Sequence, residues 1–325
     1  AGKEKVIDHE DPEATGIASW NEISIPLEDL GSVNPAAIDA ITVGVGGNDV
    51  MGKVYVDYIH THRAYPKKIV WVSFHGADDA PSGPAADVGF TEASDKAYTD
   101  LLTAQGHEVT RYITNNSPDA EILNAADLVI ISRAVSSGHY SNDAATLWNS
   151  ITAPMMITGG YVLRNSRMGY TTGGTMVDTT GDVTLTVNDP GHPIFAGVEL
   201  VDGTMVNPFA EGAVLLPTDG VTASRGISIN NSPADDEGVV LAVISESSAD
   251  TGPVGGLVIG EWAAGATLEH NGGAGADVLA GDRLVFLTGS REPSGVTGGD
   301  AAGLYDLYDD GTLMFLNAVS YMAGK

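Results

Sequence analysis

The sequence predicts an α/β protein in which a parallel sheet continues into a β-rich extension. Three observations predict this class. Strand-like and helix-like segments alternate over residues 68–157 with short connections, which is typical of parallel strands joined by right-handed crossovers. Helix-like patterns disappear beyond Tyr170, where short strand-like runs follow one another. A last apolar segment, residues 304–322, predicts one closing helix against the core.

The parallel part is predicted from four strand-like runs, at residues 68–74, 107–113, 127–132 and 155–157. The fourth is continuously apolar, as in a strand buried on both faces, and ends at Gly159 and Gly160, which allow a tight turn. A helix-like segment, residues 162–167, follows. Because ligands of open α/β sheets bind outside the carboxyl ends of the strands, we expect any site to lie here.

Three helix-like segments separate these strands. The first places Ala97, Leu101 and Ala104 on one face, which predicts that this face is buried, and Gly106 ends the segment. Serine is a favourable residue at the start of a helix because its hydroxyl accepts a backbone N–H. Ser94 and Ser117 are the expected caps of the first two helices, with Pro118 at the first position of the second, and Ser141 is expected to open the third.

The extension beyond residue 170 is predicted from six further strand-like runs, of which the last one or two return to the core of the sheet. These runs are residues 182–187, 214–216, 226–229, 239–244, 256–262 and 283–288.

Residues 1–65 have a different pattern. Apolar and polar residues alternate in three runs, at residues 20–27, 40–45 and 52–60, which predicts half-exposed strands of an antiparallel sheet. The linker at residues 63–66 then separates this β segment from the α/β domain. We therefore expect two parts, residues 1–65 and residues 66–325.

Charge and composition exclude several functions. The net charge is −28, from 43 acidic and 15 basic residues, and it repels nucleic acid and anionic lipid. No apolar run approaches 18 residues, so we expect no membrane insertion. The lack of cysteine excludes disulfides, thiolate metal sites and cysteine nucleophiles. The acidity suits an extracellular or cell-surface location, and we expect a homo-oligomer or a larger parent chain.

Arginines are the main indication of a site. The chain has eight, and four of them, Arg133, Arg164, Arg167 and Arg291, fall where strands are expected to end. Arginine forks bind carboxylate, sulfate and phosphate groups in two-point contacts. We therefore expect a site for a carbohydrate or an anionic small molecule, such as a uronate or a sulfated sugar. The alternative is that these arginines pair with acids such as Glu92 and Glu292 and hold loops together. The candidate ligand-binding residues are His75, Arg133, His139, Gly160, Tyr161, Arg164 and Arg291.

The α/β part resembles the class I glutamine-amidotransferase-like fold, and most of all its trehalose-utilisation (ThuA-like) branch. The resemblance implies a flavodoxin-like parallel sheet. Members that are active amidotransferases have a cysteine in the turn after the central strand and a histidine after a later strand. Here residues 158–161 read TGGY and residues 289–292 read GSRE, so we expect no catalytic residue of that kind. The resemblance is carried by residues 68–74, 127–133, 159–160, 189–197, 260–265, 284–289 and 315–324.

The N-terminal part resembles the closing strands of a jelly-roll, carbohydrate-binding-type module, over residues 20–27, 37–46 and 52–59. The resemblance implies that Asp57 ligates a structural calcium ion. The alternative is that Asp57 faces solvent or caps a neighbouring loop.

Three functions are open at this point. The first, which we favour, is a non-catalytic module of an extracellular carbohydrate-associated protein that binds an anionic sugar at the strand ends. The second is a hydrolase or lyase that acts on a sugar derivative at the same arginines and histidines. The third is a structural surface or filament protein.

Overall fold

The structure is a computed structural model of the chain. It describes residues 66–179, 183–206, 208–209, 227–232, 234–247, 254–270, 273, 275–292 and 299–325. Asp57 and the three N-terminal strand-like runs lie outside the described residues, as does the expected strand at residues 214–216. The jelly-roll resemblance and the calcium ion therefore stay predictions.

The parallel half of the sheet has the strand order β2-β1-β3-β4-β13. All four neighbouring pairs are parallel, and the register sets Val72 beside Ile131, Ile131 beside Ile157, and Ile157 beside Val285. This is the 2-1-3-4-5 order of flavodoxin-like folds, with β13 in the fifth place. The predicted α/β class is confirmed. The strands are β1 (Lys68–Ser73), β2 (Glu108–Ile113), β3 (Leu128–Ile131), β4 (Met155–Ile157) and β13 (Arg283–Phe286).

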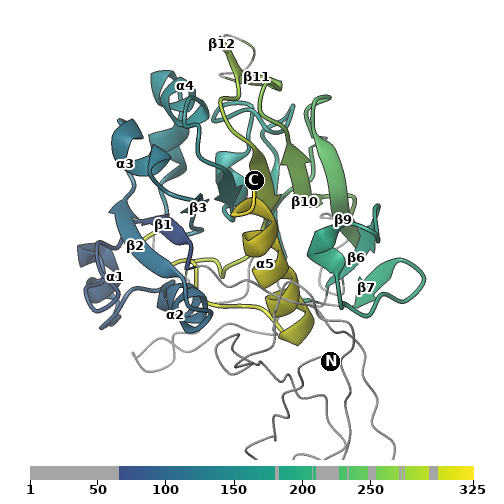
Figure 1. Ribbon diagram of the computed structural model, residues 1–325, viewed down its shortest axis with the longest axis horizontal. Coiled ribbons are helices and arrows are strands. Elements are labelled where there is room, and N and C mark those ends of the chain that lie inside the picture. The colour runs from purple at the N-terminus through teal and green to yellow at the C-terminus, as the bar shows by residue number, and fades with distance from the viewer. Residues whose placement is uncertain are drawn as a thin grey trace, which may run out of the picture. The chain divides into compact units, whose positions relative to one another are not determined.

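The β-rich extension continues the same sheet from β13 through the antiparallel strands β10, β9, β6 and β7, while β8 pairs with β10 and β5 (Figure 1). A separate hairpin joins β11 to β12. The sequence did not predict β5, β7, β11 or β12, whose short runs contain polar residues or glycine and few apolar positions. The strands are β5 (Met176–Thr179), β6 (Val183–Val187), β7 (Thr204–Val206), β8 (Ile227–Asn230), β9 (Val239–Ser247), β10 (Leu257–Trp262), β11 (Thr267–His270) and β12 (Gly275–Val278).

The caps of the helices lie one or two residues after the expected serines. The residues at the caps are Asp95, Asp119 and Asn142. The Asp119 carboxylate accepts the N–H groups of Glu121 and Ile122, whereas the Ser94 hydroxyl is bonded elsewhere. The helices are α1 (Gly83–Asp87), α2 (Lys96–Ala104), α3 (Ala120–Asn124), α4 (Asp143–Asn149) and α5 (Asp309–Met322).

Three further expectations about helices are wrong. Helix α2 buries Tyr98, Thr99 and Leu102, while Ala97 and Ala104 are exposed. The aromatic ring of Tyr98 decides the face because it stacks on Trp71, with ring centroids 5.7 Å apart. The segment at residues 162–167 forms turns after the short 3-10 helix η3 (Gly160–Val162), and α5 starts at Asp309 instead of residue 304.

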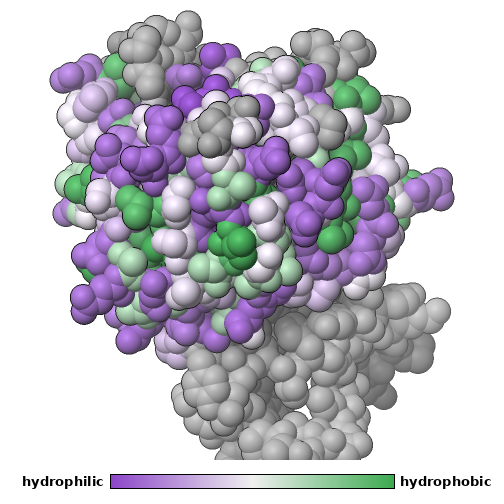
Figure 2. Space-filling model, turned by 90° about the horizontal axis from the view of Figure 1, so that it is seen from above, coloured by the Kyte–Doolittle hydropathy of each residue, from purple (hydrophilic) through white to green (hydrophobic). Residues whose placement is uncertain are grey.

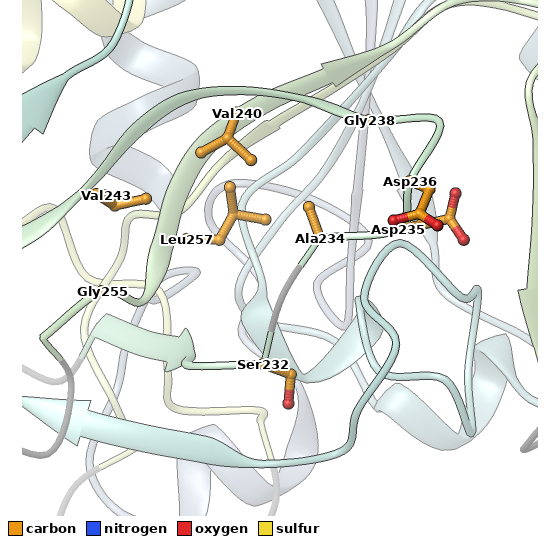
Figure 3. A pocket seen from close by; sticks show the side chains of 9 residues that line it. All are labelled: Ser232, Ala234, Asp235, Asp236, Gly238, Val240, Val243, Gly255 and Leu257. Atoms are coloured by element: carbon orange, nitrogen blue, oxygen red, sulfur yellow. The ribbon is translucent and has the colours of Figure 1, made fainter.

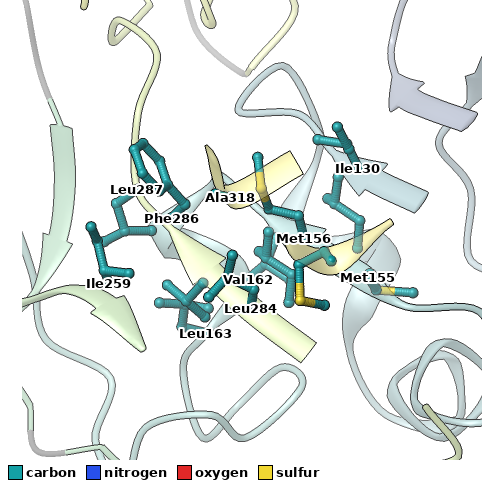
Figure 4. Close-up of a cluster of buried hydrophobic side chains, with 14 of the residues drawn as sticks. Ile130, Met155, Met156, Val162, Leu163, Ile259, Leu284, Phe286, Leu287 and Ala318 are labelled. Carbon is teal, nitrogen blue, oxygen red and sulfur yellow. The ribbon is translucent and has the colours of Figure 1, made fainter. Parts of the chain in front are cut away.

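The centre of the core lies where β4 meets β3, β13 and α5. Met155 and Met156 contribute fully buried side chains to a cluster that also contains Leu284 and Phe286 of β13 and Ala318 of α5 (Figure 4). Burying each large apolar side chain contributes about 1.5–3 kcal/mol. The carboxyl end of β4 therefore adjoins fully buried side chains of the core.

One face of the described part of the protein mixes apolar and hydrophilic residues (Figure 2). Figure 2 shows a face on which apolar residues lie in small groups among hydrophilic ones. Among the described residues, no helix combines the length and the apolar character that a membrane crossing requires.

Candidate functional site

The carboxyl ends of β3 and β4 bring together an aromatic ring and two guanidinium groups. Arg133 follows β3, while Tyr161 lies in η3 after β4 and Arg164 follows in the next turn. The Arg133 Cζ atom is 5.1 Å from the Tyr161 ring centroid, and the Arg164 Cζ atom is 5.2 Å from it. Both distances are within the range of cation–π attraction. Buried Gly160 forms the start of η3 and lets the chain turn here.

Arg164 and Arg167 meet at the hydroxyl of Ser137, and we call these three residues the arginine pair site. Arg164 Nη2 donates to Ser137 Oγ at 2.9 Å, and Arg167 Nε donates to the same oxygen at 3.3 Å. Ser137 begins the short 3-10 helix η2 (Ser137–Tyr140) after β3. Sequence reasoning missed Ser137, because nothing in the run Ser136-Ser137-Gly138 indicates which hydroxyl the arginines reach.

The arginine pair site carries two positive charges without a neighbouring carboxylate. Among the described residues, no Asp or Glu oxygen lies within 4.0 Å of the Arg164 or Arg167 nitrogens. Partial burial lowers the pKa of both guanidinium groups, and the charge of Arg167 lowers the pKa of Arg164 further. An anion bound between the two guanidinium groups would reduce their mutual repulsion and compensate for the hydration that burial removes.

Arg133 and Arg291 have a carboxylate neighbour. Arg133 Nη2 is 3.2 Å from Glu292 Oε2, and Arg291 Nε is 3.7 Å from Glu292 Oε1. Glu92, which we considered as another partner for these arginines, lies 3.7 Å from Lys96 instead. Glu292 therefore lies beside two of the four arginines, Arg133 and Arg291. The other two, Arg164 and Arg167, share the hydroxyl of Ser137.

The two candidate histidines have different environments. His75 is fully buried. Its Nδ1 accepts the Ser82 N–H at 2.9 Å, and its Nε2 is 3.0 Å from Ser94 Oγ. His139 is half-buried on η2, with Nδ1 3.2 Å from Thr114 Oγ1. Burial lowers the pKa of both rings, which favours the neutral form of each.

His75 makes stability depend on pH. The pKa of His75 is lowered in the folded protein, whereas an unfolded histidine takes up a proton below about pH 6.5. Its contribution to stability is therefore complete above that pH and is lost as the pH falls toward the folded pKa, by at most about 1.4 kcal/mol per pH unit. We expect His75→Gln to flatten the dependence of the urea midpoint on pH between about pH 5 and 7. An unchanged slope in this variant would contradict the assignment.

A buried aspartate supports the same end of the sheet. Asp95 is fully buried at the start of α2, and it accepts hydrogen bonds from Trp71 Nε1 at 2.8 Å, Ser132 Oγ at 2.6 Å and Arg111 Nη1 at 2.8 Å. These donors come from β1, the end of β3 and β2. The Asp95 carboxylate is thus hydrogen-bonded to residues of β1 and β2 and at the end of β3.

The extension contains a separate hollow of about 380 Å³ (Figure 3). Val240, Val243 and Leu257 form an aliphatic part, and Asp235 and Asp236 lie at one side. None of the predicted ligand-binding residues lines it. Among the described residues, no three His, Cys, Asp or Glu side chains are grouped as a metal site would require.

Comparison with known proteins gives similarity of structure only. No family model matches the chain, and no curated protein matches it. A putative ThuA-like protein from Bacteroides uniformis aligns at 11% identity over 82% of this chain and 95% of that one, with a TM-score of 0.45. A cytoplasmic protein from Salmonella typhimurium LT2 aligns at 12% identity over 78% and 99%, with a TM-score of 0.44. A putative GMP synthase protein from Thermoplasma acidophilum aligns at 11% over 82% and 96%, with a TM-score of 0.35. The fold class rests on the strand order and register of this chain itself.

Proposed function

We propose that this protein is a non-catalytic, extracellular carbohydrate-associated protein that binds an anionic group of an acidic saccharide at the arginine pair site. One observation carries the proposal. Arg164 and Arg167 converge on the Ser137 hydroxyl, and no carboxylate of the described residues balances their charge.

The arginine pair site has donors to offer a ligand. Arg164 Nε is bonded to Tyr161 O, and Arg167 Nη1 is bonded to Ser166. Arg164 Nη1 and Arg167 Nη2 make no hydrogen bond with a described protein atom, and both side chains are only partly buried. Because the net charge of −28 disfavours anions elsewhere on the protein, this pair is the favoured place to hold one.

The environment of the other polar residues favours binding over catalysis. His75 has both ring nitrogens in hydrogen bonds below the surface. Thr158, in the turn after β4, donates its hydroxyl to Ile131 O at 3.1 Å. Neither group is placed to attack a substrate or to accept its proton. The extracellular location and a calcium ion at Asp57 complete the proposal, and both are supported by the sequence alone.

Replacing Arg164 by alanine should weaken the binding of an acidic oligosaccharide by about 1.5–3 kcal/mol, the range for a hydrogen bond to a charged group. The reason is that the variant loses the Arg164 guanidinium, which shares the Ser137 hydroxyl with Arg167. Calorimetry of the wild type and the variant against a panel of uronate and sulfated oligosaccharides at low salt would measure the loss.

Lys96→Ala is a suitable control, because it removes one positive charge from α2, where Lys96 pairs with Asp100 and Glu92. We expect this variant to bind as the wild type does. If the wild type gives no heat with any oligosaccharide of the panel, or if both variants lose affinity equally, the proposed function is wrong.

A further inference from the structure

We infer that the arginine pair site selects a sulfate monoester over a phosphate monoester, because the side-chain groups that it presents to a ligand are hydrogen-bond donors. This inference rests on the proposed function and adds the chemical class of the bound group. It follows from the hydrogen bonds of Ser137, Arg164 and Arg167.

The Ser137 hydroxyl is held as a donor. Its oxygen accepts one N–H from Arg164 Nη2 and one from Arg167 Nε. A hydroxyl has two acceptor positions and one hydrogen, so both lone pairs are engaged and only the O–H remains to meet a ligand. Together with Arg164 Nη1 and Arg167 Nη2, the site offers three groups that can only donate.

Each of the nearest acceptors already accepts at least one N–H group. Tyr161 O accepts Arg164 Nε at 3.0 Å. Ser166 O and Ser166 Oγ accept Arg167 Nη1 at 2.8 and 3.2 Å, and Arg164 O accepts two backbone N–H groups. No carboxylate of the described residues lies within 4.0 Å of either guanidinium. A ligand that brings its own O–H would find donors facing that hydrogen.

Sulfate and phosphate monoesters differ in this one respect. A sulfate monoester carries three terminal oxygens that only accept, with one negative charge, across the usual pH range. A phosphate monoester loses its second proton with a pKa of about 6, so at about pH 5 it is mostly a monoanion with one P–O–H. At that pH the two ligands match in charge and shape, and one hydrogen separates them. A uronate also only accepts, but it has two oxygens in one plane for three donors.

Calorimetry at about pH 5 with glucose 6-sulfate, glucose 6-phosphate and glucuronate would test this. We expect the sulfate to bind at least about fivefold more tightly than the phosphate, since a donor left unpaired against other donors costs about 1–3 kcal/mol. At about pH 8 the phosphate becomes a dianion and should gain about tenfold, while the sulfate affinity stays unchanged. Both ligands are compared at one pH, so any protonation of His139 affects them alike.

Two variants connect the preference to the site. Ser137→Ala removes the hydroxyl that both arginines share and should reduce the sulfate affinity at least about fivefold, whereas Ser137→Thr keeps a hydroxyl and should retain most of it. Equal affinities for sulfate and phosphate at about pH 5, both lost in Arg164→Ala, would overturn the sulfate preference and leave the anion site in place. No binding of any of the three ligands at low salt would overturn the proposed function as well.

Discussion

Replacing Asp95 by asparagine should lower the free energy of unfolding by about 3–5 kcal/mol, the cost of removing one partner of a buried ion pair. Asp95 is fully buried and accepts from Trp71, Ser132 and Arg111, whose side chain is only 5% exposed. An asparagine side chain would turn an amide donor toward one of these donors and would leave the charge of Arg111 without its buried counterpart. Urea denaturation at neutral pH would measure the loss.

The matched control is Asp78→Asn. Asp78 contacts the same arginine, with its Oδ1 2.6 Å from Arg111 Nε, but its side chain is 44% exposed. Solvent screens this contact, so we expect the control to lose at most about 1 kcal/mol. Equal losses of unfolding free energy in the two variants would show that the burial of Asp95 does not account for its contribution to stability.

The contribution of Asp95 also has a defined pH range. Burial raises the pKa of this carboxyl, but the charge of Arg111 and the hydrogen bonds from Ser132 and Trp71 outweigh it, and the pKa ends below its ordinary value. An unfolded aspartate has a pKa of about 3.9. The stabilisation is therefore complete above about pH 4 and is lost as the pH falls from there toward the folded pKa. Asp95→Asn should lack this acid-dependent loss.

Replacing Arg283 by methionine should also destabilise the protein by about 3–5 kcal/mol. Arg283 is fully buried at the start of β13. Its guanidinium donates to four carbonyl oxygens, those of Asn149, Ile151, Ala153 and Asp282, at 2.6–3.2 Å. Methionine fills much of the space but leaves buried carbonyls unsatisfied, at about 1–3 kcal/mol for each one that water does not reach.

The effect should be specific to the buried position. Arg291→Met makes the same chemical change at a side chain that is 43% exposed, and we expect a change within about 1 kcal/mol. Thermal and urea unfolding of the two variants side by side would distinguish them. If Arg283→Met is as stable as Arg291→Met, the four carbonyl oxygens that Arg283 contacts have other hydrogen-bond partners in the variant.

The strands of the parallel half could be predicted from the sequence because the pattern is local. The run at residues 155–157 is apolar without interruption and ends in Gly159 and Gly160, and the structure has β4 there, buried between β3 and β13. The short strands β5 and β7 carry no such pattern, and helix starts were misplaced where Ser94 had a tertiary partner. A hydrophobic period indicates which face of a long segment is buried. It does not indicate which polar groups form hydrogen bonds with one another.

By itself, the sequence determined the α/β class, the edge of the sheet where a site is expected, and the lack of a cysteine nucleophile, because each depends on residue type and local spacing. Only the tertiary structure decided which arginines pair with a carboxylate and which share a hydroxyl. Glu292 follows β13 and lies beside Arg133, while Ser137 follows β3 and joins Arg164 to Arg167. It also placed His75 below the surface and Asp95 among three strands. These pairings form between segments far apart in the chain, so their distances follow from how the strands pack.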